Sequence, residues 1–181
     1  MAASARTSER GALYLVALGS NRRHGKHGAP EQVLRAALAA LAGQGLAVAA
    51  ASPIIASAPL GPAQRRYANA AALVRFAGEP PALLERLERI EASFGRRAGG
   101  RRWGARVLDL DIVLWQGGAW SSPGLTVPHR HFRTRAFVLG PAAQVAPAWR
   151  DPLTGLSLRQ LHARLTRRLT KPWPLPIAQL R

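Results

Sequence analysis

The sequence predicts an α+β fold, a ferredoxin-like βαββαβ sandwich with additional C-terminal strand and helix elements. Three observations predict it: the order strand, helix, strand, strand, helix, strand over the first 115 residues, two helices that begin at proline and end near glycine, and the absence of any internal repeat. With 181 residues the chain is long enough to bury roughly 70% of its unfolded surface in one core. We expect a disordered lead-in over residues 1–11 and a single domain over 12–181.

The first predicted strand is the apolar run over residues 13–18, which ends at Gly19. A helix follows from Pro30, since its apolar residues recur at spacings of three and four until Gly43. Residues 46–55 are the second strand candidate. The chain therefore begins with a strand, a helix and a strand.

A second strand, helix and strand follow. Residues 67–76 are the third predicted strand, and Pro80 opens a second helix that Gly95 ends. Residues 107–115 are the most strand-like stretch of the chain, because apolar and β-branched residues dominate it. These elements complete the ferredoxin-like pattern.

Beyond Trp115 the sequence gives weaker signals. It contains turn residues, a PHRHF loop, an apolar run over 137–139, and a basic helix whose leucines fall at positions 158, 161, 165 and 169. We expect this helix to pack on the domain and the KPWPLPI tail to cap it.

The charge balance is the unusual feature of the composition. The chain has 26 Lys and Arg against 9 Asp and Glu, a net charge of +17, and 24 of the basic residues are arginine. Polyanionic partners or the codon usage of a GC-rich genome would each explain this excess. The absence of cysteine excludes disulfide scaffolds, thiolate zinc sites and cysteine nucleophiles. With no apolar run of about 18 residues and no secretory signal, we expect a cytoplasmic protein.

Two of the three aspartates in the chain, Asp109 and Asp111, lie in the strand over 107–115. Alternation places them on one face with Val107, Val113 and Trp115, and Leu108, Leu110, Ile112 and Leu114 on the other. Their backbones are about 6.6 Å apart, so the two carboxylates can converge on a cation. Oxygen ligands without histidine or cysteine favour Mg²⁺. The alternative is a solvated face on which an arginine pairs with each aspartate.

A basic, glycine-containing loop precedes that strand and supplies Arg96, Arg97, Arg101, Arg102 and Arg106. Arginine forks match phosphate oxygens, so this loop beside an acidic pair suits a nucleotide phosphate chain, although a run of charge is often only a solvated loop.

Other residues near this loop have two interpretations each. Trp103 would cover a flat heterocycle or pack in the core, and His129 would contact phosphate or be structural. A zinc pair of His129 and His131 lacks further ligands. The sequence has no GxxxxGK[ST] and no GxGxxG, which excludes a P-loop enzyme and an ordinary protein kinase.

Several segments together resemble a known family. They are LGSN at 18–21, PLGP at 59–62, YANAA at 67–71, IEASFGR at 90–96, RWGARVLDLDIVLW at 102–115, and LTVPH with RAFVL between 125 and 139. In this order and spacing they resemble the 6-hydroxymethyl-7,8-dihydropterin pyrophosphokinases of folate biosynthesis, over roughly residues 12–150. The resemblance implies transfer of pyrophosphate from ATP to the pterin, with release of AMP.

The resemblance also implies roles for individual residues. Asp109 and Asp111 would bind two Mg²⁺ ions and, with Arg96 and Arg106, form the catalytic set. The ATP-binding residues would be Glu91, Arg96, Arg102, Trp103, Arg106, Ile112, Thr126, His129 and Arg135. The pterin-binding residues would be Leu60, Tyr67, Asn69, Trp103 and Phe137. ATP and the pterin would be the partners of a monomer, without nucleic acid or membrane.

The chain departs from the family pattern at Ala98, Ala105 and Arg130, all outside the acidic pair. One alternative is therefore a paralogue that binds ATP or pterin with weakened catalysis. Another is a basic RNA-binding module, although the aromatic signature of such sheets is absent and only 6% of residues are aromatic.

Overall fold

The computed structural model describes residues 11–57, 67–95 and 106–169. The predicted lead-in, up to residue 10, and the KPWPLPI tail lie outside the described residues. So does most of the basic loop before the acidic strand, since the description resumes at Arg106.

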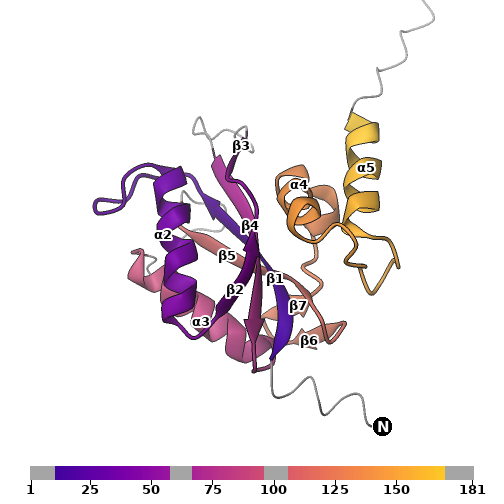
Figure 1. Ribbon diagram of the computed structural model, residues 1–181, viewed down its shortest axis with the longest axis horizontal. Helices are drawn as coiled ribbons and strands as arrows, with labels where there is room; N and C mark the ends of the chain where they lie inside the picture. The colour runs from indigo at the N-terminus through magenta and orange to yellow at the C-terminus, as the bar shows by residue number, and fades with distance from the viewer. Residues whose placement is uncertain (1–10, 58–66, 96–105, 170–181) are drawn as a thin grey trace, which may run out of the picture.

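One antiparallel sheet organises the molecule (Figure 1). Its strands are β1 (Ala12–Ser20), β2 (Ala47–Ala51), β3 (Ile55–Ser57), β4 (Tyr67–Phe76) and β5 (Asp109–Trp115). The order is β2-β4-β1-β5, and β3 also pairs with β4. This is the predicted ferredoxin-like order, because β4 lies between β1 and the strand that follows the first helix.

Two helices cover one face of the sheet, α2 (Pro30–Gly43) and α3 (Pro80–Ser93) (Figure 1). Each begins with proline in its first turn, where the missing N–H would have no partner within the helix. Their apolar residues, including Leu34 and Leu87, are fully buried against the sheet. Both helices are where the spacing of apolar residues predicted them.

The predicted single strand over 46–55 is wrong, because the structure divides it into β2 and β3. Pro53 lies between them and has no N–H to donate to a neighbouring strand. Ser52 compensates, since its backbone N–H donates to the Ala71 carbonyl at 2.8 Å and its hydroxyl accepts from the Ala71 N–H at 3.0 Å. Both parts therefore remain paired with β4.

The opposite face of the sheet carries a second core. It contains the 3₁₀ helix η1 (Phe132–Thr134) and the helices α4 (Ala136–Val145) and α5 (Leu158–Leu169), which pack over Leu15, Ala71, Val113 and Leu114. The basic helix is therefore confirmed, and the apolar run over 137–139 belongs to a helix. A hairpin of β6 (Trp120–Ser122) and β7 (Leu125–Val127) joins β5 to η1.

A β-bulge changes the alternation in β5. Leu15 pairs with Leu114 and Val16 pairs with Ile112, so Val113 has no direct partner. Val113 and Leu114 consequently both belong to the second core, whereas Trp115 packs against the first. The prediction that Trp115 shares the face of the aspartates is therefore wrong, and so is the placement of Leu114 on the other face.

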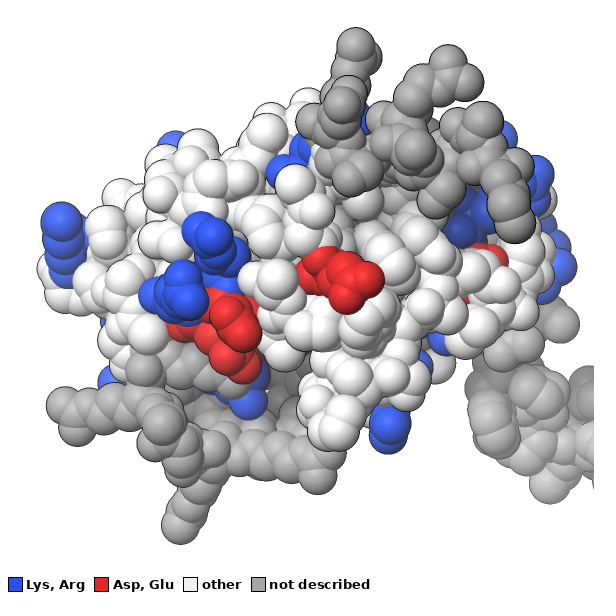
Figure 2. All heavy atoms as spheres, turned by 90° about the horizontal axis from the view of Figure 1, so that it is seen from below, with Lys and Arg blue, Asp and Glu red and all other residues white. Residues whose placement is uncertain are grey.

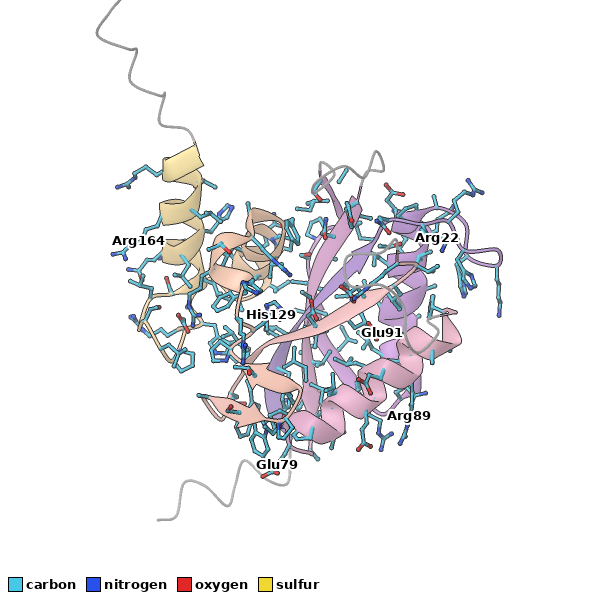
Figure 3. All side chains as sticks on the ribbon, turned by 180° about the vertical axis from the view of Figure 1, so that it is seen from behind. Arg22, Glu79, Arg89, Glu91, His129 and Arg164 are labelled. Carbon is cyan, nitrogen blue, oxygen red and sulfur yellow. The ribbon has the colours of Figure 1, made fainter. Side chains whose placement is uncertain are left out.

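The positive charge is spread unevenly. Figure 2 shows a face on which acidic and basic side chains lie side by side, and blue side chains gather at the end of the molecule where α5 lies. Arg164 on α5 points away from the body in Figure 3. Within the described residues, no helix is long and apolar enough to cross a membrane.

Candidate active site

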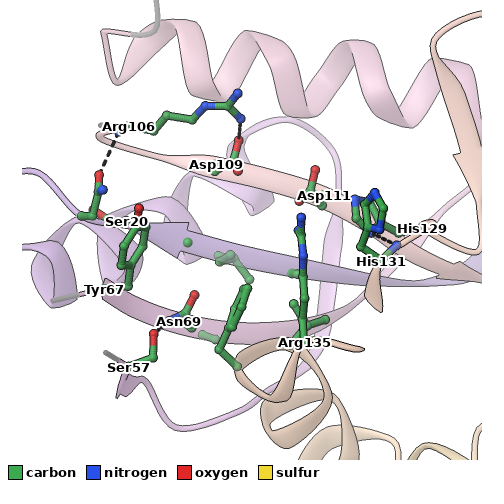
Figure 4. Close-up of a pocket in the computed structure, with 17 residues that line it drawn as sticks. Ser20, Ser57, Tyr67, Asn69, Arg106, Asp109, Asp111, His129, His131 and Arg135 are labelled. Carbon is green, nitrogen blue, oxygen red and sulfur yellow. Dashed lines mark hydrogen bonds and ion pairs between the residues drawn. The ribbon is translucent and has the colours of Figure 1, made fainter. Parts of the chain in front are cut away.

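A cavity of about 340 Å³ opens on the face of the sheet that carries α4. Its floor is formed by the C-terminal end of β1 and its walls by β4, β5, the segment before η1 and the start of α4. Among the described residues, its polar lining is Ser20, Asn21, Ser57, Tyr67, Asn69, Arg106, Asp109, Asp111, His129, His131 and Arg135 (Figure 4). Polar side chains from the strands β1, β3, β4 and β5 and from the segment between β7 and α4 therefore converge on one space.

Asp109 and Asp111 lie side by side on β5 and face the cavity (Figure 4). The Arg106 guanidinium donates to the Asp109 carboxylate. Burial and the negative charge of Asp109 raise the pKa of Asp111, although His129, Arg135 and Arg106 act in the opposite direction. Two carboxylates that destabilise each other's charge are an arrangement that a cation would relieve.

The acidic pair fits Mg²⁺ by its chemistry. Asp109 and Asp111 offer only carboxylate oxygens, and such an ion commonly takes one or two carboxylates and completes its shell with water and phosphate. In the part of the chain that the structure describes, no group of three or more histidine, cysteine, aspartate or glutamate side chains could hold a metal by itself. A zinc pair of His129 and His131, which the sequence already disfavoured, has no third ligand among those residues.

Arg106 is fixed at two levels. Its backbone N–H donates to Asn21 Oδ1 at 2.8 Å, and the Asn21 N–H donates back to the Arg106 carbonyl at 3.2 Å. Burial opposes its charge, but Asp109, Glu91 and Asp111 together raise the pKa of the Arg106 guanidinium. This arginine therefore stays charged at the cavity edge, and Asn21 holds its backbone.

His129 and Arg135 form the facing wall. The His129 N–H donates to the Val113 carbonyl at 3.0 Å, and its Nε2 lies 4.0 Å from Asp111 Oδ2. Burial lowers the pKa of His129 more than the nearby Asp111 raises it. Arg135 points from the start of α4 toward Asp111 in Figure 4. The acidic pair thus faces cationic and polar side chains.

The other half of the cavity is less charged. Asn69 is buried, and its Nδ2 donates to Ser57 Oγ at 2.7 Å. Tyr67 and Phe137 also line this half. The buried Ser20 hydroxyl has no hydrogen-bond partner among the described residues. This half offers aromatic surface together with an amide whose orientation is set by Ser57.

Gly19 separates the two halves on the floor. A Cβ placed on Gly19 would lie 3.7 Å from Asn69 Oδ1 and 4.0 Å from Asp109 Cβ. The floor between the amide and the carboxylate therefore has no side chain above it.

The structure brings together many of the residues proposed from the sequence. Those that line the cavity are Tyr67, Asn69, Arg106, Asp109, Asp111, His129, Arg135 and Phe137. Glu91 on α3 and Ile112 on β5 are instead buried away from the lining, and Thr126 lies on β7 outside it. Leu60, Arg96, Arg102 and Trp103 lie outside the described residues.

Four polar lining residues were not proposed from the sequence as substrate-binding residues. They are Ser20, Asn21, Ser57 and His131. The LGSN segment contains the first two, and its position at the end of a buried strand was a usable signal. Ser57 had none, because only the pairing of β3 with β4 brings it to Asn69.

Comparison with known families decides to which family this fold belongs. The model of the 7,8-dihydro-6-hydroxymethylpterin-pyrophosphokinase (HPPK) family matches residues 15–147, which include every cavity-lining residue of the described chain. The chain belongs to the HPPK family. The family membership predicted from the sequence is confirmed.

Curated relatives agree with this assignment. The chain is 42% identical over 139 residues to the 2-amino-4-hydroxy-6-hydroxymethyldihydropteridine pyrophosphokinase of Pseudomonas aeruginosa, covering 76% of this chain and 82% of that protein. It is 38% identical over 133 residues to the Haemophilus influenzae protein of the same name, covering 72% and 79%. The Synechocystis relative is 38% identical, and the match spans 66% of this chain but 60% of that protein.

Solved HPPK structures share the fold. The Plasmodium falciparum HPPK-DHPS crystallised with pteroate superposes with a TM-score of 0.68 at 11% identity. The superposition covers 93% of this chain and 45% of the Plasmodium chain. The predicted α+β fold is therefore confirmed by HPPK structures as well as by the strand order.

Proposed function

We propose that the chain transfers pyrophosphate from ATP to the hydroxymethyl oxygen of 6-hydroxymethyl-7,8-dihydropterin in folate biosynthesis. The products are the pterin diphosphate and AMP. One observation carries the proposal: the acidic pair Asp109 and Asp111 faces a cavity that also holds Arg106 and Arg135 and continues toward Asn69 and Tyr67. HPPK membership specifies the reaction that such a divided cavity serves.

Asp109 and Asp111 would hold Mg²⁺, with two ions proposed. When bound, Mg²⁺ neutralises phosphate charge and lowers the cost of bringing an oxygen nucleophile to an anionic phosphorus. Arg106 keeps its contact with Asp109, which orients that carboxylate, and its remaining N–H groups are available to phosphate. Arg135 approaches the same space from the opposite wall (Figure 4).

The pterin would occupy the less charged half. Tyr67 and Phe137 supply aromatic surface for a flat heterocycle. Because Asn69 Nδ2 already donates to Ser57, its Oδ1 is directed to accept from an N–H on the pterin edge. The hydroxymethyl group then points across Gly19 toward the phosphates.

The chemical step exchanges one P–O bond for another. The pterin hydroxyl oxygen bonds to the β-phosphorus of ATP, the bond from that phosphorus to the oxygen bridging the α-phosphate breaks, and AMP leaves with that oxygen. The hydroxyl proton passes to solvent. Such a transfer depends on positioning and charge stabilisation more than on covalent help, so Arg106 and Arg135 act by orienting phosphates.

The remaining features of the proposal concern the protein as a whole. We propose a monomer in the cytoplasm, with residues 12–181 as one domain. The absence of heptad repeats from the sequence supports the monomer.

The direct test incubates the purified chain with Mg²⁺, ATP and 6-hydroxymethyl-7,8-dihydropterin and separates the nucleotide products. We expect AMP and pterin diphosphate in equal amounts, and no AMP when the pterin is omitted. Formation of ADP in place of AMP, or no turnover while both substrates bind, would overturn the proposal.

A further inference from the structure

The segment after α4 makes an ion pair with Arg133 of η1, next to the wall of the cavity. Arg133 Nε donates to Asp151 Oδ2 at 2.7 Å, and Arg133 Nη2 donates to Asp151 Oδ1 at 2.6 Å. The Asp151 side chain is fully buried. A two-pronged contact of this kind fixes the direction of both side chains as well as their distance.

Asp151 is itself held rigidly. Its carboxylate also accepts from the Thr154 hydroxyl at 2.6 Å and from the Leu153 N–H at 3.2 Å. Its backbone N–H donates to the Leu156 carbonyl, and its carbonyl accepts from the Gly155 N–H. The carboxylate is thus a fixed point in a closed turn that leads into α5.

Arg133 lies in the middle of η1, and the residues on either side of η1 line the cavity. His131 directly precedes η1, and Arg135 lies between η1 and α4. Phe132 anchors the same turn from the other side, because it is fully buried in the second core. The turn between the two cavity residues is therefore held by one apolar and one ionic contact.

We propose that Asp151 is a positioning residue that, through Arg133, holds η1 so that Arg135 and the segment carrying His129 and His131 face the acidic pair. Asp151 lies beyond residue 147, where the match to the family model ends. The inference rests on the proposed function, since it assigns Arg135 to the phosphate side of the cavity. By this inference, the turn before α5 helps to orient the residues that line the cavity.

The energetics of ion pairs that are removed from water, as Asp151 is fully and Arg133 mostly, agree with this role. Burying two charges costs about as much as their attraction returns, so a neutral pair of similar volume is often equally stable. What a neutral pair lacks is the directional fork of Arg133 on Asp151. The contact is therefore suited to specifying a geometry.

The test compares variants in steady-state turnover, in ATP affinity by titration calorimetry, and in thermal unfolding. For Asp151→Ala we expect a lower unfolding temperature and a kcat/KM for ATP reduced about 10- to 100-fold. The double substitution Arg133→Met with Asp151→Asn removes both charges and keeps the volume. We expect it to recover much of the unfolding temperature while kcat/KM for ATP stays reduced by the same factor.

Glu85→Gln is the matched control, because it removes an exposed carboxylate that pairs with Arg89 on α3, away from the cavity lining. We expect its kcat/KM for ATP to equal that of the unsubstituted chain. Arg133→Lys keeps the charge without the fork, and we expect a reduced kcat/KM for ATP here as well, which provides the test should the other variants not fold.

A double variant with unaltered kcat/KM and ATP affinity would overturn the inference. Failure of the proposed function would look different, because the unsubstituted chain itself would form no AMP. In that case the calorimetric ATP affinities of the same variants still decide whether Asp151 positions the site.

Discussion

The backbone N–H of Leu110 donates to the buried Glu91 carboxylate at 2.8 Å. Leu110 lies between Asp109 and Asp111, so this bond ties the part of β5 that carries both aspartates to α3. Glu91 is 1% exposed and lies beneath the strand, away from the cavity lining. In this position it fixes the strand that presents the carboxylates.

The Leu110–Glu91 bond predicts different outcomes for two substitutions of Glu91. Glu91→Gln keeps an acceptor oxygen for the Leu110 N–H, whereas Glu91→Ala leaves that buried N–H without one. We expect Glu91→Ala to lower the free energy of unfolding by about 1–3 kcal/mol more than Glu91→Gln does. Urea denaturation measures the difference, and equal losses would show that the bond contributes nothing.

Substitution of Asp111 is expected to lower activity without lowering the free energy of unfolding. Asp111→Asn removes a charge that Asp109 and burial oppose, so the free energy of unfolding without Mg²⁺ should not fall. The rate of AMP formation should fall by about 10²- to 10³-fold or more, because a carboxylate proposed to bind Mg²⁺ beside the phosphates is lost.

Glu88→Gln is the matched control for Asp111→Asn, since Glu88 is an exposed carboxylate on α3. We expect the Glu88 variant to form AMP at the rate of the unsubstituted chain. An Asp111→Asn variant that is equally active would refute the metal assignment, as would Asp109→Ala with retained turnover.

Ser57 is predicted to act on the pterin through Asn69. Ser57→Ala frees the Asn69 amide to rotate, so KM for the pterin should rise about 2- to 10-fold while kcat is unchanged. Steady-state kinetics with varied pterin measure this. Ser121→Ala, on the exposed β6 residue, is the control, and a Ser57 variant that behaves like it would remove Ser57 from the site.

Asp151 predicts a pH dependence of stability. Burial alone would raise the pKa of Asp151, but hydrogen bonds from Arg133, Thr154 and Leu153 more than offset burial and hold the pKa below its ordinary value of 3.8. Since the folded pKa is depressed, the stabilisation is present above the unfolded pKa of Asp151 and is lost as the pH falls through the folded pKa. The unfolding free energy of the unsubstituted chain should therefore exceed that of Asp151→Asn near neutrality and converge with it in acid. If the difference in unfolding free energy between the two proteins stayed constant across this pH range, the depressed pKa of Asp151 would be contradicted.

Local signals predicted the first half of the fold well. Helices α2 and α3 have proline at their start and an apolar stripe on one side, and β4 has an apolar run between turn residues, so each element is determined by its own sequence. The acidic pair was also visible, because aspartate is unfavourable in a strand and its presence there needs a reason.

The remaining errors occur where pairing or packing overrides local sequence. The bulge at Val113 follows from the register of β5 against β1, which no pattern within β5 reveals. Helix α4 contains Pro141, and Gln144 is its one polar residue, because the sheet and α5 cover most of its surface. It therefore shows only a weak amphipathic period. The contact of Ser57 with Asn69 likewise exists only because two separate strands pair.

Gly19 sets the distance over which two different molecules can be joined. With hydrogen as its side chain, no atom of Gly19 rises between Asn69 Oδ1 and Asp109 Cβ, and we expect the two substrates to meet there. Its backbone conformation and the contacts of an added Cβ are ordinary, so we expect a larger residue at position 19 to leave the fold intact and to block the reaction. With valine at this position, we expect each substrate still to bind and the transfer of pyrophosphate between them to be blocked by the added side chain.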